Sequence, residues 1–407
     1  MKMMNAASRL HDCTEEHKEF FTGLITLIVS VSLSFITGTY LGSVADILVL
    51  IPGLMVIVTP SINMRGAIAG ILTSRLSSSM HLGAFDVKLG KNTELGDNLR
   101  ASIILIVIVS TVLAVFGKII CLITGTQVIG IIEMIIISVI SGTIAGFIVV
   151  MLGILISLIC YRKRFNLDMV GAPVVTTIGD MITLPCIVVT AVIIMELPKI
   201  WEIIFGIIVV ALMVWAIFSM KNCTRTVKDV LKEGVPLLIP LSLIGVIAGV
   251  FYTVRLDELI TFAAVLILTS PFMNGCGSIG GILTSRIGTE MHMGLVDPKI
   301  IPQKIVMMHF LQNYLFGAII LTLMGFFSHY SAVIFGIATP GLLPMLILSL
   351  SSGAIVITIM NLLGYYTTVA AYRKGFDPDN FGVPVVTSSI DLIGATVILI
   401  MMSILFV

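Results

Sequence analysis

The stretch Pro173-Val-Val-Thr-Thr-Ile-Gly-Asp180 recurs 211 residues later as Pro384-Val-Val-Thr-Ser-Ser-Ile-Asp391. Between residues 161 and 180, 11 of 20 positions are identical to their counterparts at this offset. A second motif, Gly70-Ile-Leu-Thr-Ser-Arg75, returns at the same offset as Gly281-Ile-Leu-Thr-Ser-Arg286. Shared hydrophobicity alone does not give this level of identity. The chain therefore contains two copies of one unit.

The composition is typical of a membrane protein. Of the 407 residues, 58% are hydrophobic and 11% are charged, whereas an average soluble domain has roughly 25% charged residues. This composition makes membrane lipid an expected partner. The formal net charge of +1 gives no field that would attract nucleic acid, so nucleic acid is not expected as a partner. The six cysteines lack metal-ligand spacing, and we expect them to act as packing residues.

Eleven apolar runs have about the length that crosses a bilayer. We expect an all-α polytopic membrane protein with spans near residues 20–41, 46–70, 102–124, 128–160, 172–195, 200–219, 235–253, 257–281, 305–327, 332–370 and 384–406. The segment Met1–Lys18 lacks the apolar core of a cleavable signal, so the first span is expected to be retained.

Five spans per copy is an odd number, and the unrepeated span near 200–219 restores the orientation of the second copy. The two five-helix repeats are therefore expected to be parallel, related by a pseudo-twofold along the membrane normal. With a cytoplasmic N-terminus and an external C-terminus in a multi-pass cell-membrane protein, 19 of the 23 basic residues fall inside. The expected division is a cytoplasmic segment 1–18, a first repeat 19–197, a linker helix and loop 198–233, and a second repeat 234–407.

Two aspartates are the first candidates for binding an ion. Asp180 and Asp391 occupy the same position in the fifth span of each repeat, and ionisable groups at bilayer depth usually mark an ion or substrate path. A pseudo-twofold would bring the two carboxylates face to face, where they would offset one divalent charge. Hard oxygen ligands suit Mg²⁺, which often keeps several waters. The structural alternative is an interhelical hydrogen bond or a pair with a buried arginine such as Arg65.

Two further repeated pairs are candidate ligands from the second and fifth spans. Thr176 and Thr387 stand four residues before the aspartates, on the same helical face, where each hydroxyl could hold a coordinated water. Asn63 and Asn274 share one stripe of the second spans with small residues, next to a proline that can free backbone carbonyls. A pore-lining role is favoured for the asparagines, with helix packing as the alternative for the stripe.

Asp46 and Asp257 form a third acidic pair, at the outer ends of the second spans. They could concentrate cations at an external mouth. An acidic residue at a solvated helix N-terminus, favoured by the helix dipole, explains them equally well.

These motifs resemble solute carrier family 41 and the membrane domain of the MgtE magnesium transporters. The resemblance rests on the stretch from Pro60 through Arg65-Gly66 to Thr73-Ser-Arg-Leu76, and on Ala172–Asp180 with Met181-Ile-Thr183. It implies a fused form of a dimer of five-helix subunits, with the cation site centred on the fifth-helix aspartates Asp180 and Asp391. One chain would then supply a complete pore without an obligate oligomer. Cys276 stands where the first repeat has Arg65, so the two halves are not equivalent.

Three classes of function remain open at this point. The first is transport of Mg²⁺ as a channel or carrier, with Na⁺ left open as a coupling ion. The second is a proton- or sodium-coupled carrier of another substrate, in which the same aspartates titrate. The third, an intramembrane aspartyl protease, is disfavoured because Thr177-Ile-Gly-Asp180 departs from a GxGD motif and no Pro-Ala-Leu segment occurs. We therefore expect a transporter and not an enzyme.

Overall fold

The computed structural model describes residues 2–81, 90, 93–163, 167–221, 223–374 and 378–406, with side chains described from residue 23 onward except at scattered positions. Every regular element among these residues is a helix. Eleven of the helices are long and apolar enough to cross a membrane, which confirms the expected fold class. The helices are α1 (Lys2–Ser43), α2 (Ala45–Leu50), α3 (Leu54–His81), α4 (Glu94–Thr124), α5 (Ile131–Lys163), α6 (Leu167–Glu196), α7 (Lys199–Lys221), α8 (Arg225–Val254), α9 (Leu256–Thr261), α10 (Ala264–His292), α11 (Lys304–Ile334), α12 (Leu342–Arg373) and α13 (Pro378–Phe406).

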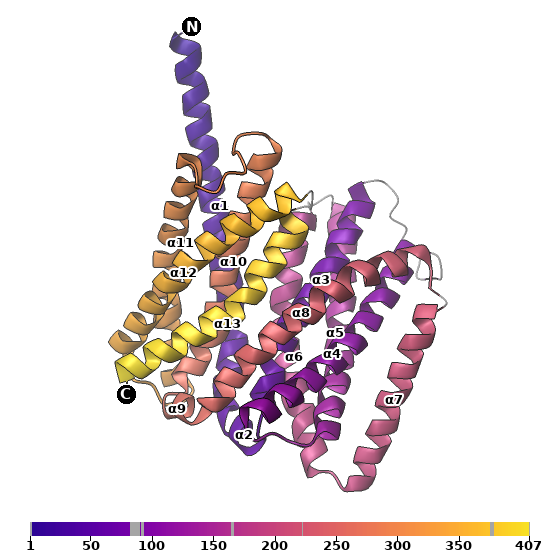
Figure 1. Cartoon of the computed structure of the whole chain (residues 1–407). Helices are drawn as coiled ribbons and strands as arrows, with labels where there is room; N and C mark the ends of the chain where they lie inside the picture. The colour runs from indigo at the N-terminus through magenta and orange to yellow at the C-terminus, as the bar shows by residue number, and fades with distance from the viewer. Residues whose placement is uncertain are drawn as a thin grey trace.

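The two repeats run in the same direction through the molecule. Helices α1 to α6 and α8 to α13 follow the same order, and the short helices α2 and α9 lie at the same end (Figure 1). Helix α7 stands at the side of the bundle, against α4 and α5. Helix α7 leads from the end of α6, on the side of the short helices, toward the opposite side, where α8 starts (Figure 1). Helix α8 then runs through the bundle in the same direction as α1.

The first helix of each repeat packs mainly against the other repeat. Helix α1 lies along α10, and α8 lies along α3 and α4. Glycines permit these close crossings: a Cβ at Gly249 would lie 2.8 Å from Met55 O, and one at Gly38 would approach Ile267 O well inside 3.0 Å. Gly38 and Gly249 are counterparts at the 211-residue offset. We call this arrangement, in which α1 and α8 each pack against the other repeat, the exchange of first helices. It joins the two repeats through close backbone contacts.

Both second spans differ from the single helices expected from the sequence. The range 46–70 is divided between α2 and α3, and the range 257–281 between α9 and α10. In the first repeat the break contains Gly53, whose φ of 79° lies in the left-handed region that favours glycine. Backbone hydrogen bonds stabilise both breaks, from Ile129 N to Pro52 O at 3.1 Å and from Ala264 N to Ala338 O at 3.0 Å. A hydropathy window does not detect such a break, because the residues across it stay apolar.

Three other helix ends also differ from expectation. Helix α12 begins ten residues later than the apolar run near 332–370, because Gly336 and Gly341 adopt φ of 68° and 107° in the preceding loop. Helices α6 and α13 begin at residues 167 and 378, which is five and six residues before the spans expected near 172–195 and 384–406. The aspartates Asp180 and Asp391 consequently lie near the middle of their helices.

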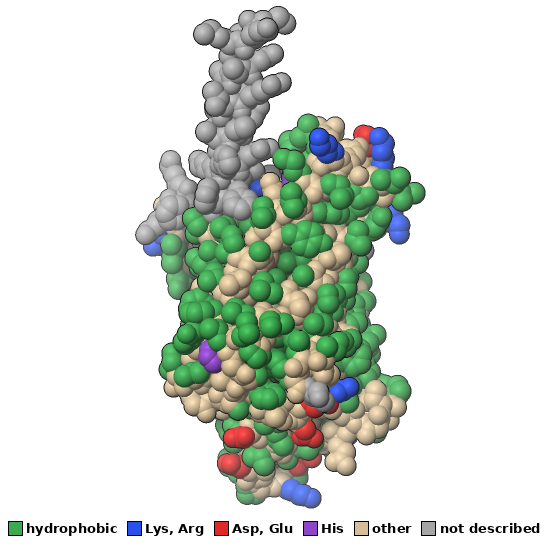
Figure 2. All heavy atoms as spheres, turned by 90° about the vertical axis from the view of Figure 1, so that its left-hand side faces the viewer, with side chains coloured by type: hydrophobic (Ala, Val, Ile, Leu, Met, Phe, Trp, Pro, Cys, Tyr) green, Lys and Arg blue, Asp and Glu red, His purple; other side chains and the backbone are tan. Residues whose placement is uncertain are grey.

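The face of the bundle shown in Figure 2 is a broad apolar band with charged side chains at its two ends. Helix α7 also exposes an apolar surface, since only 17% of its most apolar window is buried inside the bundle. Its exposed side chains include Trp201, Ile207, Val214 and Phe218. Large exposed apolar side chains along a helix long enough to cross a membrane fit hydrocarbon and not water.

Candidate functional site

The two repeated aspartates approach each other between the repeats. Asp180 lies on α6 and Asp391 on α13, and their carboxyl groups are close enough for the charge of one to act on the other. Asp391 is buried, with 3% of its surface exposed, whereas Asp180 is partly exposed. Two carboxylates at this separation repel each other unless a cation or a proton offsets their charge.

The two asparagines of the second spans have different partners. Asn63 of α3 hydrogen-bonds the Asp391 carboxyl group, which joins the first repeat to the second. Asn274 of α10 instead donates to Ser34 Oγ of α1 and accepts from Ser278 Oγ at 3.4 Å. Only Asn63 is therefore seen in contact with a candidate ligand, and the site departs from twofold symmetry at this pair.

Two threonines were expected to extend the site on the same helical face. Thr387 is partly exposed on α13, four residues before Asp391, and it has a bonded or electrostatic partner. Thr176 lies outside the residues whose side chains the structure describes. The next position in each repeat carries Thr177 and Ser388, both buried hydroxyl residues. They stand three residues before the aspartates, and the 211-residue repeat could have nominated them.

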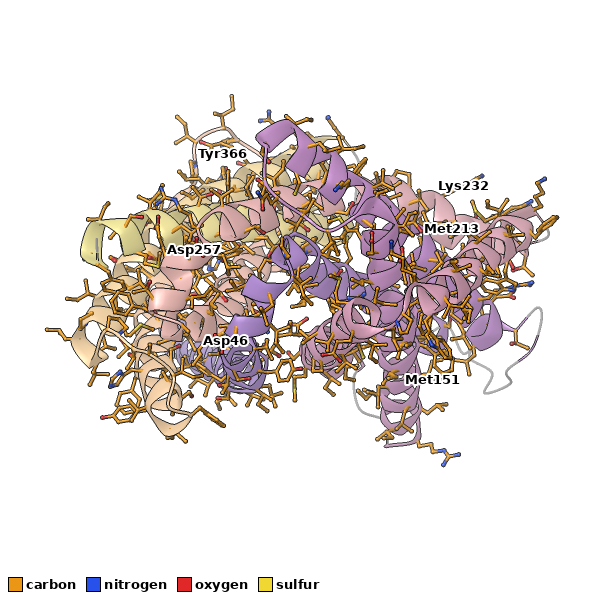
Figure 3. All side chains as sticks on the ribbon, turned by 90° about the horizontal axis from the view of Figure 1, so that it is seen from below. Asp46, Met151, Met213, Lys232, Asp257 and Tyr366 are labelled. Atoms are coloured by element: carbon orange, nitrogen blue, oxygen red, sulfur yellow. The ribbon has the colours of Figure 1, made fainter. Side chains whose placement is uncertain are left out.

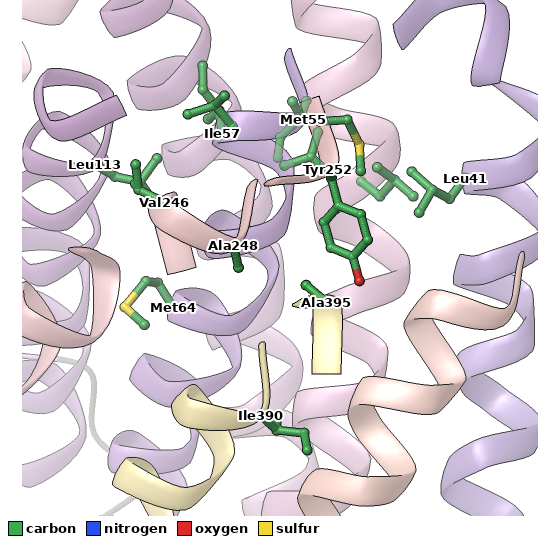
Figure 4. Packing of buried hydrophobic residues seen from close by; sticks show 14 of the residues in the cluster. Leu41, Met55, Ile57, Met64, Leu113, Val246, Ala248, Tyr252, Ile390 and Ala395 are labelled. Carbon is green, nitrogen blue, oxygen red and sulfur yellow. The ribbon is translucent and has the colours of Figure 1, made fainter. Parts of the chain in front are cut away.

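A tyrosine from the exchanged helix α8 also reaches the site. Tyr252 is 2% exposed, and its hydroxyl has no hydrogen-bond partner among the described residues. The charge of Asp391 acts on this hydroxyl, which points toward the segment of α13 that carries Ala395 (Figure 4). Its counterpart in the first repeat is Leu41, so the repeat gave no signal that would single out Tyr252.

The third acidic pair lies away from this site, at the end of the bundle with the short helices. Asp46 is in the first turn of α2 and Asp257 in the first turn of α9, and the two helices contact each other. Both side chains are exposed, as Figure 3 shows from below. They are therefore not ligands of the buried site, and each occupies a short separate helix instead of the start of a transmembrane span.

Arg65 does not neutralise the aspartates. Its guanidinium makes one hydrogen bond within the described part of the chain, from Nη1 to Ser61 O at 3.1 Å. The proposed alternative, in which a buried Arg65 pairs with Asp180 or Asp391, is therefore not seen. The other alternative, an interhelical hydrogen bond, holds for Asp391 through Asn63.

The available ligands suit a hydrated hard cation. The searched residues contain no group of three or more His, Cys, Asp or Glu side chains that could hold a metal ion. Two carboxylates, an amide oxygen and hydroxyl groups are what remains around Asp180 and Asp391. Such a set matches the oxygen preference of Mg²⁺, which usually keeps waters and takes one or two carboxylates.

Comparison with known proteins gives a consistent result. Residues 58–190 and 269–401, which are separated by the same 211-residue offset, match the family model of MgtE, described as a divalent cation transporter. Solute carrier family 41 member 3 of Mus musculus is 23% identical over 369 residues, covering 85% of this chain and 74% of that protein. Member 2 of Macaca fascicularis is 24% identical over 388 residues, covering 87% of this chain and 63% of that protein. No solved structure shows significant similarity.

Proposed function

Because the chain belongs to the MgtE family of divalent cation transporters, we propose that it carries Mg²⁺ across the membrane along the boundary between its two repeats. The family is one of transporters and not of enzymes. In this proposal Asp180 and Asp391 bind the hydrated ion together, and their two negative charges balance its two positive charges. The similarity to members of solute carrier family 41 supports the same proposal.

The proposal rests on the electrostatic interaction between one acidic residue from each repeat. Asp180 comes from the first repeat and Asp391 from the second, and the charge of Asp391 acts on the Asp180 carboxyl group. Asn63 crosses the same boundary to reach Asp391. Burying two like charges together is unfavourable by several kcal/mol unless a cation or protons neutralise them. A transported divalent cation would provide that neutralisation.

The residues around the aspartates would act on the water shell of the ion. A hydrated Mg²⁺ offers water molecules as hydrogen-bond donors, and the Asn63 amide and the hydroxyls of Thr387 and Tyr252 are acceptors in reach of that region. Thr176, the counterpart of Thr387 at the 211-residue offset, is a further candidate ligand. Asn274, the counterpart of Asn63, hydrogen-bonds Ser34 and Ser278 instead of an aspartate. Holding the ion through its waters avoids the high cost of dehydrating Mg²⁺.

The exposed aspartates Asp46 and Asp257 would raise the local cation concentration at one mouth of the path. We propose that this mouth faces outward, with the N-terminus cytoplasmic, the C-terminus external, and the protein in the cell membrane. In that orientation a potential of 100 mV, negative inside, favours entry of a divalent ion by about 4.6 kcal/mol. One chain contains both repeats, so a single chain would form the whole path.

A second candidate function is a proton- or sodium-coupled carrier of another substrate. The burial of Asp391, at 3% exposure, favours it, because a deeply buried carboxyl group can also work by gaining and losing a proton. Both functions use the same aspartates, and the difference lies in which ion they bind.

Flux measurements in liposomes separate these functions. The purified chain is reconstituted with a Mg²⁺-sensitive dye inside, and Mg²⁺ is added outside with no other gradient, with a Na⁺ gradient, or with a pH gradient. We expect dye-reported Mg²⁺ entry that requires the protein and occurs with the Mg²⁺ gradient alone. Absence of Mg²⁺ flux under all three conditions, from protein that remains monodisperse, would overturn the proposal.

Binding in detergent provides the second arm of this test. We expect Mg²⁺ to raise the Tm of the chain, whereas Na⁺ at equal ionic strength does not. Stabilisation by Na⁺ or by acidification alone would favour the second candidate function. Asp297→Asn is the control, because Asp297 lies in an exposed loop, where it pairs with Lys299, and the substitution is expected to leave both readouts unchanged.

A further inference from the structure

A buried cation without a counter-charge lies in the first repeat. Arg65 of α3 has 4% of its surface exposed, and its Nη1 donates to Ser61 O at 3.1 Å. Its Nε and Nη2 atoms are buried and have no hydrogen-bond partner among the described residues. No acidic side chain in the described part of the chain pairs with it. This guanidinium therefore needs a partner that the protein side chains do not supply.

A small cavity lies beside this guanidinium, between α3 and α4. It leaves about 10 Å³ for the centre of a water-sized sphere, which is room for about one water molecule or one small ion. Most of its wall is apolar, and two of its side chains, Met64 and Leu113, are labelled in Figure 4. The wall consists of Ser61, Met64, Arg65 and Ile68 from α3, and Ile106, Val109, Ser110 and Leu113 from α4.

The backbone of α5 at Gly142 packs closely against Arg65 and Ser110 beside the cavity. A Cβ at Gly142 would lie 3.1 Å from Arg65 Nη2 and well inside 3.0 Å of Ser110 Oγ. Arg65 Nη2 and Ser110 Oγ consequently sit next to the same backbone position. A guanidinium N–H and a hydroxyl that can donate a proton thus lie together at the wall of the cavity.

The unpaired edge of the guanidinium has the geometry that binds anions. Nε and Nη2 lie on the same edge of the group, so their N–H bonds point in parallel and can both reach one acceptor. Arginine keeps its charge at neutral pH, so the buried positive charge is not removed by loss of a proton. A water molecule would accept these hydrogen bonds but would leave the positive charge uncompensated in apolar surroundings. The size of the cavity excludes a larger oxyanion.

We propose that this cavity binds one small monovalent anion of the size of chloride, held by Arg65 Nε and Nη2 and by the Ser110 hydroxyl. The second repeat has Cys276 in place of Arg65, so the chain has one such site and not two. Among the described residues, Arg65 makes no hydrogen bond or ion pair with Asp180 or Asp391. The proposal therefore stands or fails separately from the proposed path for Mg²⁺.

Thermal unfolding of the full chain in detergent tests this site without any transport assay. Tm is measured in Mg²⁺-free buffer while sodium gluconate is replaced stepwise by sodium chloride at constant ionic strength. We expect a saturable rise of about 2 °C with chloride, reproduced by bromide. Arg65→Met keeps a long apolar side chain but removes the charge, and it is expected to abolish the rise. Arg255→Gln, at an exposed arginine paired with Glu258, is the control that keeps it.

A second variant covers the case in which Arg65→Met does not fold. Gly142→Ala combined with Ser110→Ala places a methyl group beside Nη2 and removes the hydroxyl with which that methyl would clash. We expect this double variant to fold and to need at least about tenfold more chloride for half of the rise. A Tm of the wild-type chain that does not depend on chloride would show that the cavity holds water only and would overturn the proposal. A chloride response that is unchanged in either variant would overturn it as well.

Discussion

The exchanged helix α1 depends on Gly38, where a single added methyl group should destabilise the whole bundle. A Cβ at this position would meet Ile267 O well inside 3.0 Å and Pro271 Cδ at 3.1 Å. Ile267 O belongs to the backbone of α10, so it cannot turn aside as a flexible side chain would. Helix α1 would have to move away from α10 along much of its length.

The size of the effect follows from overpacking at a backbone contact. Inserting one methyl group into a tightly packed core costs about 1–3 kcal/mol, and we expect Gly38→Ala to lower Tm by on the order of 2–5 °C. Gly249→Ala should have a similar effect, because its Cβ would lie 2.8 Å from both Met55 O and Val56 Cα of α3. The two substitutions test the two halves of the same exchange.

Gly70→Ala provides the matched control for these variants. A Cβ at Gly70 has no atom within 4 Å, although Gly70 also lies inside a membrane-spanning helix. Alanine is favoured over glycine in a helix by about 0.5–1 kcal/mol, so this variant should be as stable as the wild type or slightly more stable. Each variant is purified in the same detergent and unfolded by heating with a thiol-reactive or intrinsic fluorescence readout. If Gly38→Ala unfolds at the wild-type Tm, the exchange of α1 described here is wrong.

Three further predictions concern the candidate cation site. Asn63→Ala should weaken Mg²⁺ binding about tenfold or more, because a hydrogen bond to a charged group contributes roughly 1.5–3 kcal/mol. Asn274→Ala, which leaves Asp391 untouched, should weaken Mg²⁺ binding less. Titration of Tm with Mg²⁺ compares the two variants, and equal losses of affinity would contradict the different roles given to the two asparagines. Asp46→Asn with Asp257→Asn should reduce Mg²⁺ flux about two- to fivefold at low salt and not at high salt, since exposed charges are screened; a reduction that persists at high salt would count against a role in concentrating cations. Tyr252→Phe should leave Tm unchanged or higher, because the removed hydroxyl has no partner, yet it should lower flux at low Mg²⁺, and unchanged flux would remove Tyr252 from the site.

The fold class is predictable from the sequence because two strong signals coincide. Apolar runs of bilayer length identify the spans, and the 211-residue repeat shows that they form two units joined by one extra helix. The odd number of spans per unit then determines that the units are parallel. These signals depend on composition and spacing alone, so they can be read from the sequence without knowing which helices contact each other.

The breaks and the exchange of first helices were not predictable in the same way. The residues around Gly53 are as apolar as a continuous span, although Ile51 is extended and Gly53 has a positive φ between α2 and α3. The exchange depends on which helices touch, and α1 would present the same apolar surface to either repeat. Gly38 and Gly249 indicate a close crossing, but their spacing does not identify the partner helix.

The repeat nominated the paired members of the site and missed the unpaired ones. Asp180, Asp391 and Asn63 were found because each has a counterpart at the same offset. Tyr252 has Leu41 as its counterpart, so symmetry gave no reason to select it. Arg65 was noticed because Cys276 replaces it, but its lack of a partner became visible only when the helices around it were placed.

The central proposal is that Asp180 and Asp391 together bind the transported Mg²⁺. The most direct test is Mg²⁺ flux into liposomes that contain the double variant Asp180→Asn and Asp391→Asn, measured beside Asp297→Asn at equal protein content. Asparagine keeps the size of each side chain and one acceptor oxygen but removes both negative charges, so we expect a folded protein with a Tm near that of the wild type and flux reduced at least about 100-fold. Near-normal Mg²⁺ flux through the double variant would contradict the proposal that these carboxylates bind the ion.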